Sequence, residues 1–530
     1  MKCRAPFCSN CLNPFLLLPW LAALSILFTA GAAAATGNSG PEASQSPMEP
    51  AVYSSNHFAV DLYHRLGKEK AGENLFFSPY SMTTALAMTA EGARAETALQ
   101  MGRALCFPES LRQKKCHLPW DLAPLHTAMA QLHRLFNGPE KADQAEIRAR
   151  IKGLRNRLEA AQKASAEAKK AHNWQAYRAA AQEEQEIASR LNDLLARVDQ
   201  YELRVANALW AEKTYPFKES YLKTIAEYYG TGSAFPADFR KNFQAERVRI
   251  NRWVEEETSD RIRDLIPAGA LDPYTRLVLT NAIFFKGEWS RPFQEKATRT
   301  EPFTLSEGTT IQVPMMNARA LDVARYAAFQ ADGSFFNTPA TIERGQKAGL
   351  YPGEDGFSMV ELPYKGGDLA MVIIAPNRPG GMGALEKGFT TEDLDDWIDK
   401  LQERKVHVSL PNFKQETSYE MKPTLQALGM DRAFVDPFKP NGAQFGGMTT
   451  STDPLKQLYI TQVMHKAFVE VNEKGTEAAA ATAVIMARAT AALTTPFIPA
   501  FKADRPFIYL IRDRRTGTIL FLGRMMNPQD

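Results

Sequence analysis

The sequence has few cysteines: five in 530 residues, three of which lie within the first eleven positions. The two others, Cys106 and Cys116, are too few for a disulfide framework or a structural zinc site. Neither His nor Cys recurs at the short intervals of a metal-binding finger, so we expect no metal and no cofactor. A disulfide between Cys106 and Cys116 and two free thiols both remain open.

The motifs of common enzyme classes are also missing. The chain has no Gly-x-Ser-x-Gly turn of serine hydrolases, no His-Glu-x-x-His helix of zinc proteases and no glycine-rich phosphate loop. Its formal net charge is only +3, and no long block of like charge occurs. A nucleic-acid partner would call for a strongly basic surface. We therefore expect neither an enzyme nor a nucleic-acid-binding protein.

Only one long apolar run is present, from Phe15 to Ala30. Lys2 and Arg4 precede it and small residues follow, which is the order found in secretory signal peptides. We predict a signal peptide over residues 1–36, a flexible leader over 37–50 and one domain over 51–530, secreted or periplasmic. A membrane anchor is the alternative, but the run is short for a spanning helix of about 20 residues. After cleavage we expect a monomer without membrane contact.

Proline is absent between residues 141 and 198, where Ala, Glu, Gln, Lys and Arg dominate. Apolar residues recur there at alternating intervals of four and three, which is typical of a coiled coil. This spacing predicts an inserted antiparallel helical hairpin over 140–198, turning near 172–174. Between residues 148 and 157 the first arm carries five basic residues: Arg148, Arg150, Lys152, Arg155 and Arg157. They fit either a solvated face or a contact with a polyanion or a protein.

The remaining sequence is rich in helices early and in strands late, which predicts an α+β fold. Helical periodicity extends over 52–66, 78–88, 247–266 and 419–428, and strand-like runs cover 205–210, 277–285, 357–362, 369–375 and 406–410. A second irregular stretch, roughly 325–353, is interpreted as a loop insertion.

Turn residues are missing from an exposed-looking stretch near the carboxyl end. After a strand over 467–472 the chain breaks at residues 473–475, and small or β-tolerant residues then continue without a turn residue until Pro496. In a strand, every second side chain points to the same face. One face would then carry Thr476, Ala478, Ala480, Thr482, Val484 and Met486, all of which could lie against a core. The composition also suits a solvated helix, so these residues alone leave both structures open.

Several motifs resemble the serpin family in family order over about residues 52–528. They are Asn-Leu-Phe-Phe-Ser-Pro-Tyr-Ser at 74–81, Ala-Asn-Ala-Leu-Trp at 206–210, Asn-Ala-Ile-Phe-Phe-Lys-Gly-Glu-Trp at 281–289, Val-Pro-Met-Met at 313–316 and Leu-Pro-Asn-Phe at 410–413. Glu-Lys-Gly-Thr-Glu-Ala-Ala at 473–479 is similar to the hinge of inhibitory serpins. Asp-Arg-Pro-Phe at 504–507 and Phe-Leu-Gly-Arg at 521–524 resemble their closing strands.

The resemblance implies helices packed on a five-stranded central sheet A, further sheets B and C, and an exposed reactive centre loop over residues 473–500. It implies a bacterial-type secreted inhibitor of serine-type endopeptidases: the target cleaves the loop, forms an acyl-enzyme and is carried away when the loop inserts into sheet A. A non-inhibitory serpin acting as carrier or chaperone is the alternative. The expected partner is an elastase-like or trypsin-like protease, with a cysteine protease as a further candidate.

The resemblance also assigns functional residues. The hinge comprises Glu473, Gly475, Thr476, Glu477, Ala478, Ala479, Ala480 and Ala481. The cluster where sheet A opens comprises Ser78, Ser81, Asn281 and His465. The usual loop length places the reactive bond between Ala489 and Thr490, whereas the basic Arg488 favours cleavage between Arg488 and Ala489 by a protease with an acidic pocket.

Overall fold

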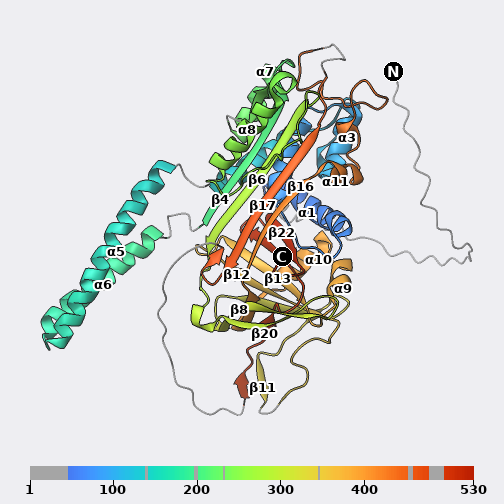
Figure 1. The fold of residues 1–530 in the computed structure, drawn as a ribbon. Coiled ribbons are helices and arrows are strands. Elements are labelled where there is room, and N and C mark those ends of the chain that lie inside the picture. Colours follow the sequence, from blue (N-terminus) through green and yellow to red (C-terminus); the bar gives the residue numbers. More distant parts are fainter. Residues whose placement is uncertain are drawn as a thin grey trace, which may run out of the picture. The chain divides into compact units, whose positions relative to one another are not determined.

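The computed structural model describes residues 46–137, 141–195, 201–230, 233–343, 346–451, 457–476 and 494–530. Helices dominate the first half and strands the second (Figure 1), which confirms the predicted α+β class. The helices are α1 (Glu49–Glu69), α2 (Pro79–Gly92), α3 (Ala95–Ala104), α4 (Ala123–Asn137), α5 (Lys141–Lys170), α6 (Trp174–Leu195), α7 (Glu219–Tyr229), α8 (Phe239–Glu257), α9 (Met382–Lys387), α10 (Thr391–Asp399) and α11 (Lys422–Ala427). Among the described residues, no helix is long and apolar enough to cross a membrane.

Sheet A is the central sheet, and its long strands run side by side in Figure 1. Its order is β16 (Phe413–Glu420), β17 (Gln462–Asn472), β18 (Gly475–Thr476), β6 (Leu277–Glu288), β4 (Tyr201–Glu212) and β5 (Ala234–Ala237). The central strand β6 is buried on both faces, as its nearly continuous apolar sequence requires. Leu279 and Ile283 face the main core, whereas Val278 and Ala282 face a second apolar cluster that includes Ile250 of α8.

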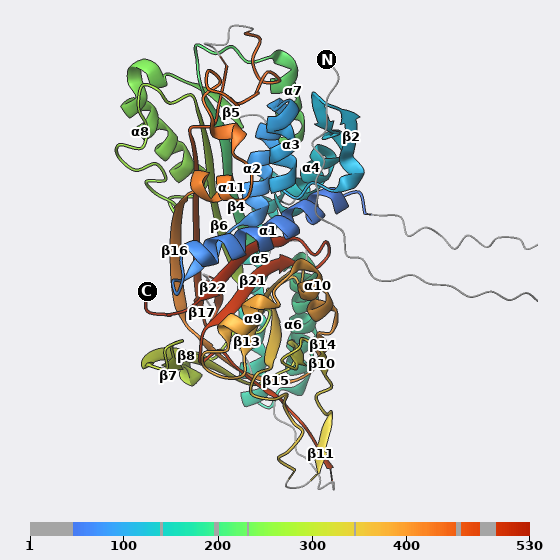
Figure 2. The ribbon, with the colours of Figure 1, turned by 90° about the vertical axis from the view of Figure 1, so that its right-hand side faces the viewer.

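Two further sheets pack around this one. Sheet B comprises β1 (Leu75–Phe77), β22 (Ile519–Met525), β21 (Phe507–Asp513), β13 (Leu369–Pro376), β12 (Phe357–Pro363), β9 (Arg325–Phe329), β10 (Phe335–Phe336) and β14 (Gln402–Glu403). Sheet C comprises β20 (Ala500–Lys502), β15 (Val406–Pro411), β8 (Thr310–Leu321) and β7 (Arg299–Thr304). Figure 2 shows α1 passing beside β22, the last strand of the chain.

Two small antiparallel sheets complete the described structure. One joins β2 (Arg112–Lys115) to β3 (Leu118–Trp120). The other joins β11 (Thr341–Glu343) to β19 (Thr494–Pro496), two segments that are far apart in the sequence. The stretch 325–353 was interpreted as a loop insertion, and this is wrong for β9 and β10, which belong to sheet B, and for β11, whose partner is distant in the sequence.

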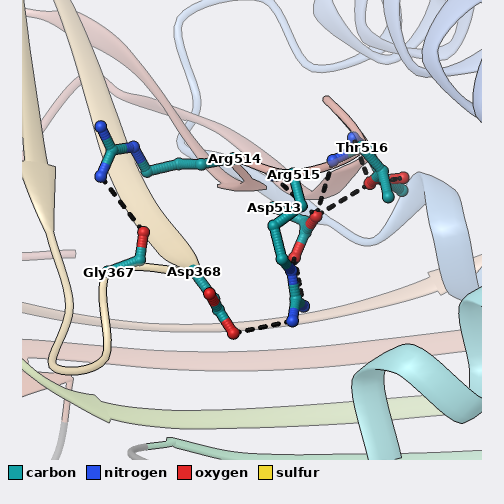
Figure 3. Close-up of polar contacts among 7 residues, drawn as sticks. Gly367, Asp368, Asp513, Arg514, Arg515 and Thr516 are labelled. Atoms are coloured by element: carbon teal, nitrogen blue, oxygen red, sulfur yellow. Dashed lines mark hydrogen bonds and ion pairs between the residues drawn. The ribbon is translucent and has the colours of Figure 1, made fainter. Parts of the chain in front are cut away.

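The turn between β21 and β22 is fixed by charge. Asp513 is fully buried and accepts hydrogen bonds from the Arg515 guanidinium and from the Thr516 hydroxyl, as Figure 3 shows. Arg515 also reaches Asp368 at 2.7 Å, in the turn between β12 and β13. Because a buried carboxylate needs such partners, this network ties the closing strands to the middle of sheet B.

Helices α5 and α6 pack against each other along an apolar seam. Ile151, Ala161, Ile187 and Leu191 are buried there, at the alternating spacing of the sequence pattern. The turn around His172 has a positive φ of 53°. Arg157 forms a surface ion pair of 3.5 Å with Glu183 across the two helices, and Lys152 and Arg155 are exposed.

Three predicted boundaries differ from the structure. Helix α1 starts at Glu49, inside the predicted leader, because Pro50 fits a first helical turn, where no N–H needs a partner. Helix α8 starts earlier and ends earlier than the predicted 247–266: the Asp238 carboxylate caps it, and left-handed Ser259 and Asp260 follow its end. Of residues 419–428, Tyr419 and Glu420 belong to β16, and only α11 is helical.

Candidate functional site

The hinge enters sheet A at its first residues. After β17 the chain turns at Glu473 and Lys474, and Gly475 and Thr476 then form β18, antiparallel both to β17 and to β6. Gly475 has a φ of 145°, and a Cβ atom there would stand 2.2 Å from the carbonyl oxygen of Gly287. Only glycine permits this conformation and this close approach to β6.

The turn before β18 is held by the start of sheet C and by Trp289. The Thr298 hydroxyl donates to the Glu473 carboxylate at 2.6 Å. The Trp289 N–H donates to the Lys474 carbonyl at 2.9 Å, and its indole N–H donates to the Asn472 carbonyl at 3.0 Å. The Trp289 ring is itself buried and stacks on Tyr364 at 4.7 Å. The acidic residue of the hinge motif therefore lies at the edge where β18 enters the sheet.

Beyond β18, the strands β6 and β17 pair directly with each other. Gln462–Phe468 of β17 run parallel to Val278–Phe284 of β6. The two strands thus pair with each other along most of their length but diverge at the end that admits Gly475 and Thr476. A strand that follows β18 would be antiparallel to both neighbours, and antiparallel pairs carry slightly more stable hydrogen bonds than the parallel pair it would replace.

Four residues that the sequence assigns to the opening of the sheet lie together beneath this parallel pair. The Ser78 hydroxyl caps α2 by accepting from the Ser81 N–H at 3.1 Å, and it donates to the Leu520 carbonyl at 2.6 Å. Asn281 of β6 donates to the Ser81 hydroxyl at 2.7 Å. His465 of β17 hydrogen-bonds through Nδ1 to the Asn281 side-chain oxygen. The cluster therefore links α2 to the two strands that flank the entry point.

A fifth member, Asn207 of β4, was missed at the sequence level. It lies opposite Asn281 in the β4–β6 register and accepts from the Ser81 hydroxyl at 2.9 Å. It also accepts from the Asn281 amide at 2.5 Å. The motif at 206–210 contained this asparagine, and its polar side chain within an apolar strand was the available signal.

His465 is neutral in this environment. The Ser78 N–H donates to its Nε2 at 3.2 Å, so Nδ1 carries the proton and donates to Asn281. Complete burial lowers the pKa of His465 from 6.5 to about 3, because a charged imidazole would lose its hydration. A second proton on Nε2 would also remove the acceptor of the Ser78 N–H.

The rest of the hinge and the reactive bond lie outside the described residues. These are Glu477, Ala478, Ala479, Ala480 and Ala481 of the hinge, and Arg488, Ala489 and Thr490 around the bond. The two cysteines are described and are both free: Cys106, which is half-buried, donates to Asp61, and Cys116 is exposed. In the described part of the chain no group of three His, Cys, Asp or Glu side chains could hold a metal ion.

The three sheets, the hinge at the end of β17 and the cluster beneath β6 define the architecture of a serpin. The family model "Serpin (serine protease inhibitor)" matches residues 53–197 and 154–528. The chain therefore belongs to the serpin family, as its motifs predicted.

Relatives from distant organisms support this assignment. An uncharacterized serpin-like protein of Thermococcus kodakarensis is 34% identical over 91% of this chain and 87% of its own length. Human serpin B10 is 31% identical over 91% of this chain and its entire length. Mouse antithrombin-III is 31% identical over 92% of this chain and 84% of its own.

Solved structures share the fold. Uncleaved ovalbumin superposes with a TM-score of 0.62 at 23% identity, over 90% of this chain and all of its own. Human thyroxine-binding globulin gives a TM-score of 0.64 at 24% identity, over 91% of this chain and all of its own. At these identities the likeness concerns the fold alone.

Proposed function

We propose that this serpin is exported, as secreted or periplasmic protein, and inhibits serine-type endopeptidases by suicide-substrate trapping. The target attacks the loop after β18 and forms an acyl-enzyme, and the cleaved loop then becomes a strand of sheet A. Serpins are mostly inhibitors rather than catalysts, and we assign no enzymatic activity to this one.

The observation that carries the proposal is the position of β18. Gly475 and Thr476 already lie between β17 and β6, in the orientation that an inserted strand requires. Insertion of the residues that follow breaks the parallel ladder between β6 and β17 and forms an antiparallel ladder with each of them. The sheet thus gains one ladder of hydrogen bonds, worth about 0.5–1.5 kcal/mol each, net of those lost to water. Once cleavage frees its far end, the loop has a continuous path along which to gain stability.

The register of β18 supports the same conclusion. Thr476 faces Val471 of β17 and Gly287 of β6. If this register continues, Ala480 comes to lie between Ala467 and Ile283, both of which are fully buried in the main core. Thr482 comes to lie between His465 and Asn281, where its hydroxyl can replace the hydrogen bond that these residues share in the uncleaved protein. Ala480 thus coincides with the face of the sheet that is turned toward the main core, and Thr482 coincides with the polar cluster.

The residue before the reactive bond determines which class of protease can attack the loop. Cleavage between Ala489 and Thr490 suits an elastase-like enzyme with a small specificity pocket, and cleavage between Arg488 and Ala489 suits a trypsin-like enzyme with an acidic pocket. We favour Ala489.

The test mixes the mature protein with elastase-like, trypsin-like and papain-like cysteine proteases and looks for a covalent complex that survives boiling in detergent. Amino-terminal sequencing of the released peptide then gives Thr490 for the first bond or Ala489 for the second. The nicked protein is expected to melt at a higher temperature than the intact one. Clean cleavage without a complex or a rise in melting temperature would identify a non-inhibitory carrier or chaperone instead.

The helical hairpin has a separate candidate role, as a contact for a polyanion or a protein through exposed Lys152 and Arg155. Arg157 already pairs with Glu183, so part of the basic face is neutralised within the hairpin. Deletion of residues 140–198 tests the contact by heparin-affinity chromatography. Unchanged retention of the shortened protein would rule out the polyanion contact.

A further inference from the structure

Two segments that are far apart in the sequence pair with each other in this structure. The stretch 325–353, interpreted from the sequence as a loop insertion, contains β11, and the carboxyl-terminal part of the predicted reactive centre loop, 473–500, contains β19. Thr341, Ile342 and Glu343 lie opposite Pro496, Thr495 and Thr494. Figure 1 shows β11 and the dark red arrow of β19 side by side at one end of the molecule. The two segments therefore form one structural unit.

The pairing is specific in its hydrogen bonds. The Phe497 N–H donates to the Ala340 carbonyl at 2.9 Å. Because hydrogen-bonded and non-hydrogen-bonded pairs alternate along an antiparallel ladder, Ile342 and Thr495 form the next hydrogen-bonded pair. Pro496, which has no N–H, occupies the intervening position opposite Thr341, where none is needed.

Side chains from outside the two strands hold this unit to sheet C. Arg404, two residues before β15, donates to the carbonyls of Thr338 at 3.1 Å, Pro339 at 2.9 Å and Phe497 at 3.1 Å. The Tyr351 hydroxyl accepts from the Ala500 N–H at 3.1 Å, and its ring meets Phe497 edge to face at 5.6 Å. One guanidinium thus bridges the insertion and the chain that leaves the loop.

We propose that residues 338–343, together with Arg404 and Tyr351, form a brace that positions the reactive bond for the attacking protease. This proposal rests on the proposed function, because it assigns a second anchor to the same loop. The brace holds the carboxyl side of the loop, whereas β18 holds the amino side.

The length of chain between anchor and bond sets the size of the effect. Thr490 is four residues before Thr494, so the reactive bond lies within about 14 Å of the brace. Without the brace the next anchor is Pro499, whose carbonyl accepts from the His407 N–H at 2.8 Å. A tether of nine residues in place of four samples a volume about threefold larger, since the volume grows as the 3/2 power of chain length.

The experiment compares Ile342→Pro, which removes an N–H that pairs with β19, with Thr341→Pro, whose N–H points away from it. Arg404→Ala and Arg404→Lys form a second pair. Two quantities are measured. The first is the second-order rate constant for attack on the loop, with covalent complex and cleaved product counted together, and the second is the stoichiometry of inhibition. Ile342→Pro and Arg404→Ala are expected to slow attack about threefold at unchanged stoichiometry, and Thr341→Pro is expected to match the wild type.

Limited digestion with thermolysin gives an independent readout that does not require inhibition. Cuts in the wild type and in Thr341→Pro are expected between residues 477 and 493 only, and cuts in Ile342→Pro are expected to spread to 494–499. Identical cut sites and identical attack rates in all variants would overturn the brace, and so would a changed stoichiometry at an unchanged rate. Attack on the loop is counted whether or not a complex forms, so the test of the brace does not require inhibition. Failure of the inhibitory mechanism would be seen separately, as cleavage of the wild type without a covalent complex.

Discussion

Replacement of Ala480 by glutamate tests loop insertion directly. Continuation of the β18 register brings residue 480 between Ile283 and Ala467, which are 0% exposed. A carboxylate cannot remain charged there and must take up a proton. Protonation of a carboxyl with an ordinary pKa of about 4.3 costs about 4 kcal/mol at pH 7.4. If half of this cost is felt in the transition state for insertion, insertion slows about 30-fold.

The assay is the stoichiometry of inhibition, because hydrolysis of the acyl-enzyme competes with insertion. Ala480→Glu is expected to form an acyl-enzyme at the normal rate but to release most of the protease, so cleaved serpin accumulates in place of covalent complex. The partition between trapping and hydrolysis should shift about 30-fold toward hydrolysis.

The matched control is Ala479→Glu, one residue away. In the same register it lies between Phe284 and Phe468 on the opposite face, where the guanidinium of Arg261 and the ammonium of Lys414 lie over the two rings at 5.5 and 5.2 Å. A carboxylate there has cations close by, so Ala479→Glu should keep a stoichiometry near that of the wild type. Equal effects of the two substitutions would refute the assigned register, and the absence of any effect would refute insertion itself.

Two further predictions concern stability. Burial lowers the pKa of His465 to about 3, so below pH 6.5 the unfolded chain binds a proton that the native state does not. The contribution of this residue to the free energy of unfolding should therefore fall by about 1.4 kcal/mol per pH unit from pH 6.5 toward pH 3. In urea titrations at different pH values, His465→Gln should lose that part of the pH dependence. Gly475→Ala should lower the melting temperature by displacing β18, at a cost of about 2 kcal/mol, whereas Gly153→Ala, which meets nothing within 4 Å in α5, should raise stability by about 0.5–1 kcal/mol.

The sequence was most informative where a pattern is local or belongs to the family. The predicted strand 277–285 lies within β6, because an apolar run of this length buried on both faces has few other structures open to it. The cluster of Ser78, Ser81, Asn281 and His465 came from the family resemblance, and the described part of the structure adds Asn207 to it.

The pairing of β11 with β19 could not be predicted in this way. Its two strands are short, they are separated by some 150 positions in the sequence, and none of the motifs that revealed the family falls on either of them. Arg404 links the two segments, and its three acceptors are backbone carbonyls, which leave no mark in the sequence. Register in so short a ladder is specified by tertiary contacts rather than by alternation of side chains.

The two anchors of the loop differ in what they permit after cleavage. On the amino side, β18 leads to the parallel pair of β6 and β17, so each residue that follows it can add to sheet A as these two strands part. On the carboxyl side, β19 is fixed by β11 and Arg404 and continues into β20 of sheet C. An acyl-enzyme is attached through the carbonyl of the residue before the broken bond. In the proposed mechanism the protease therefore remains on the segment that can move, while the brace keeps the other new terminus in place.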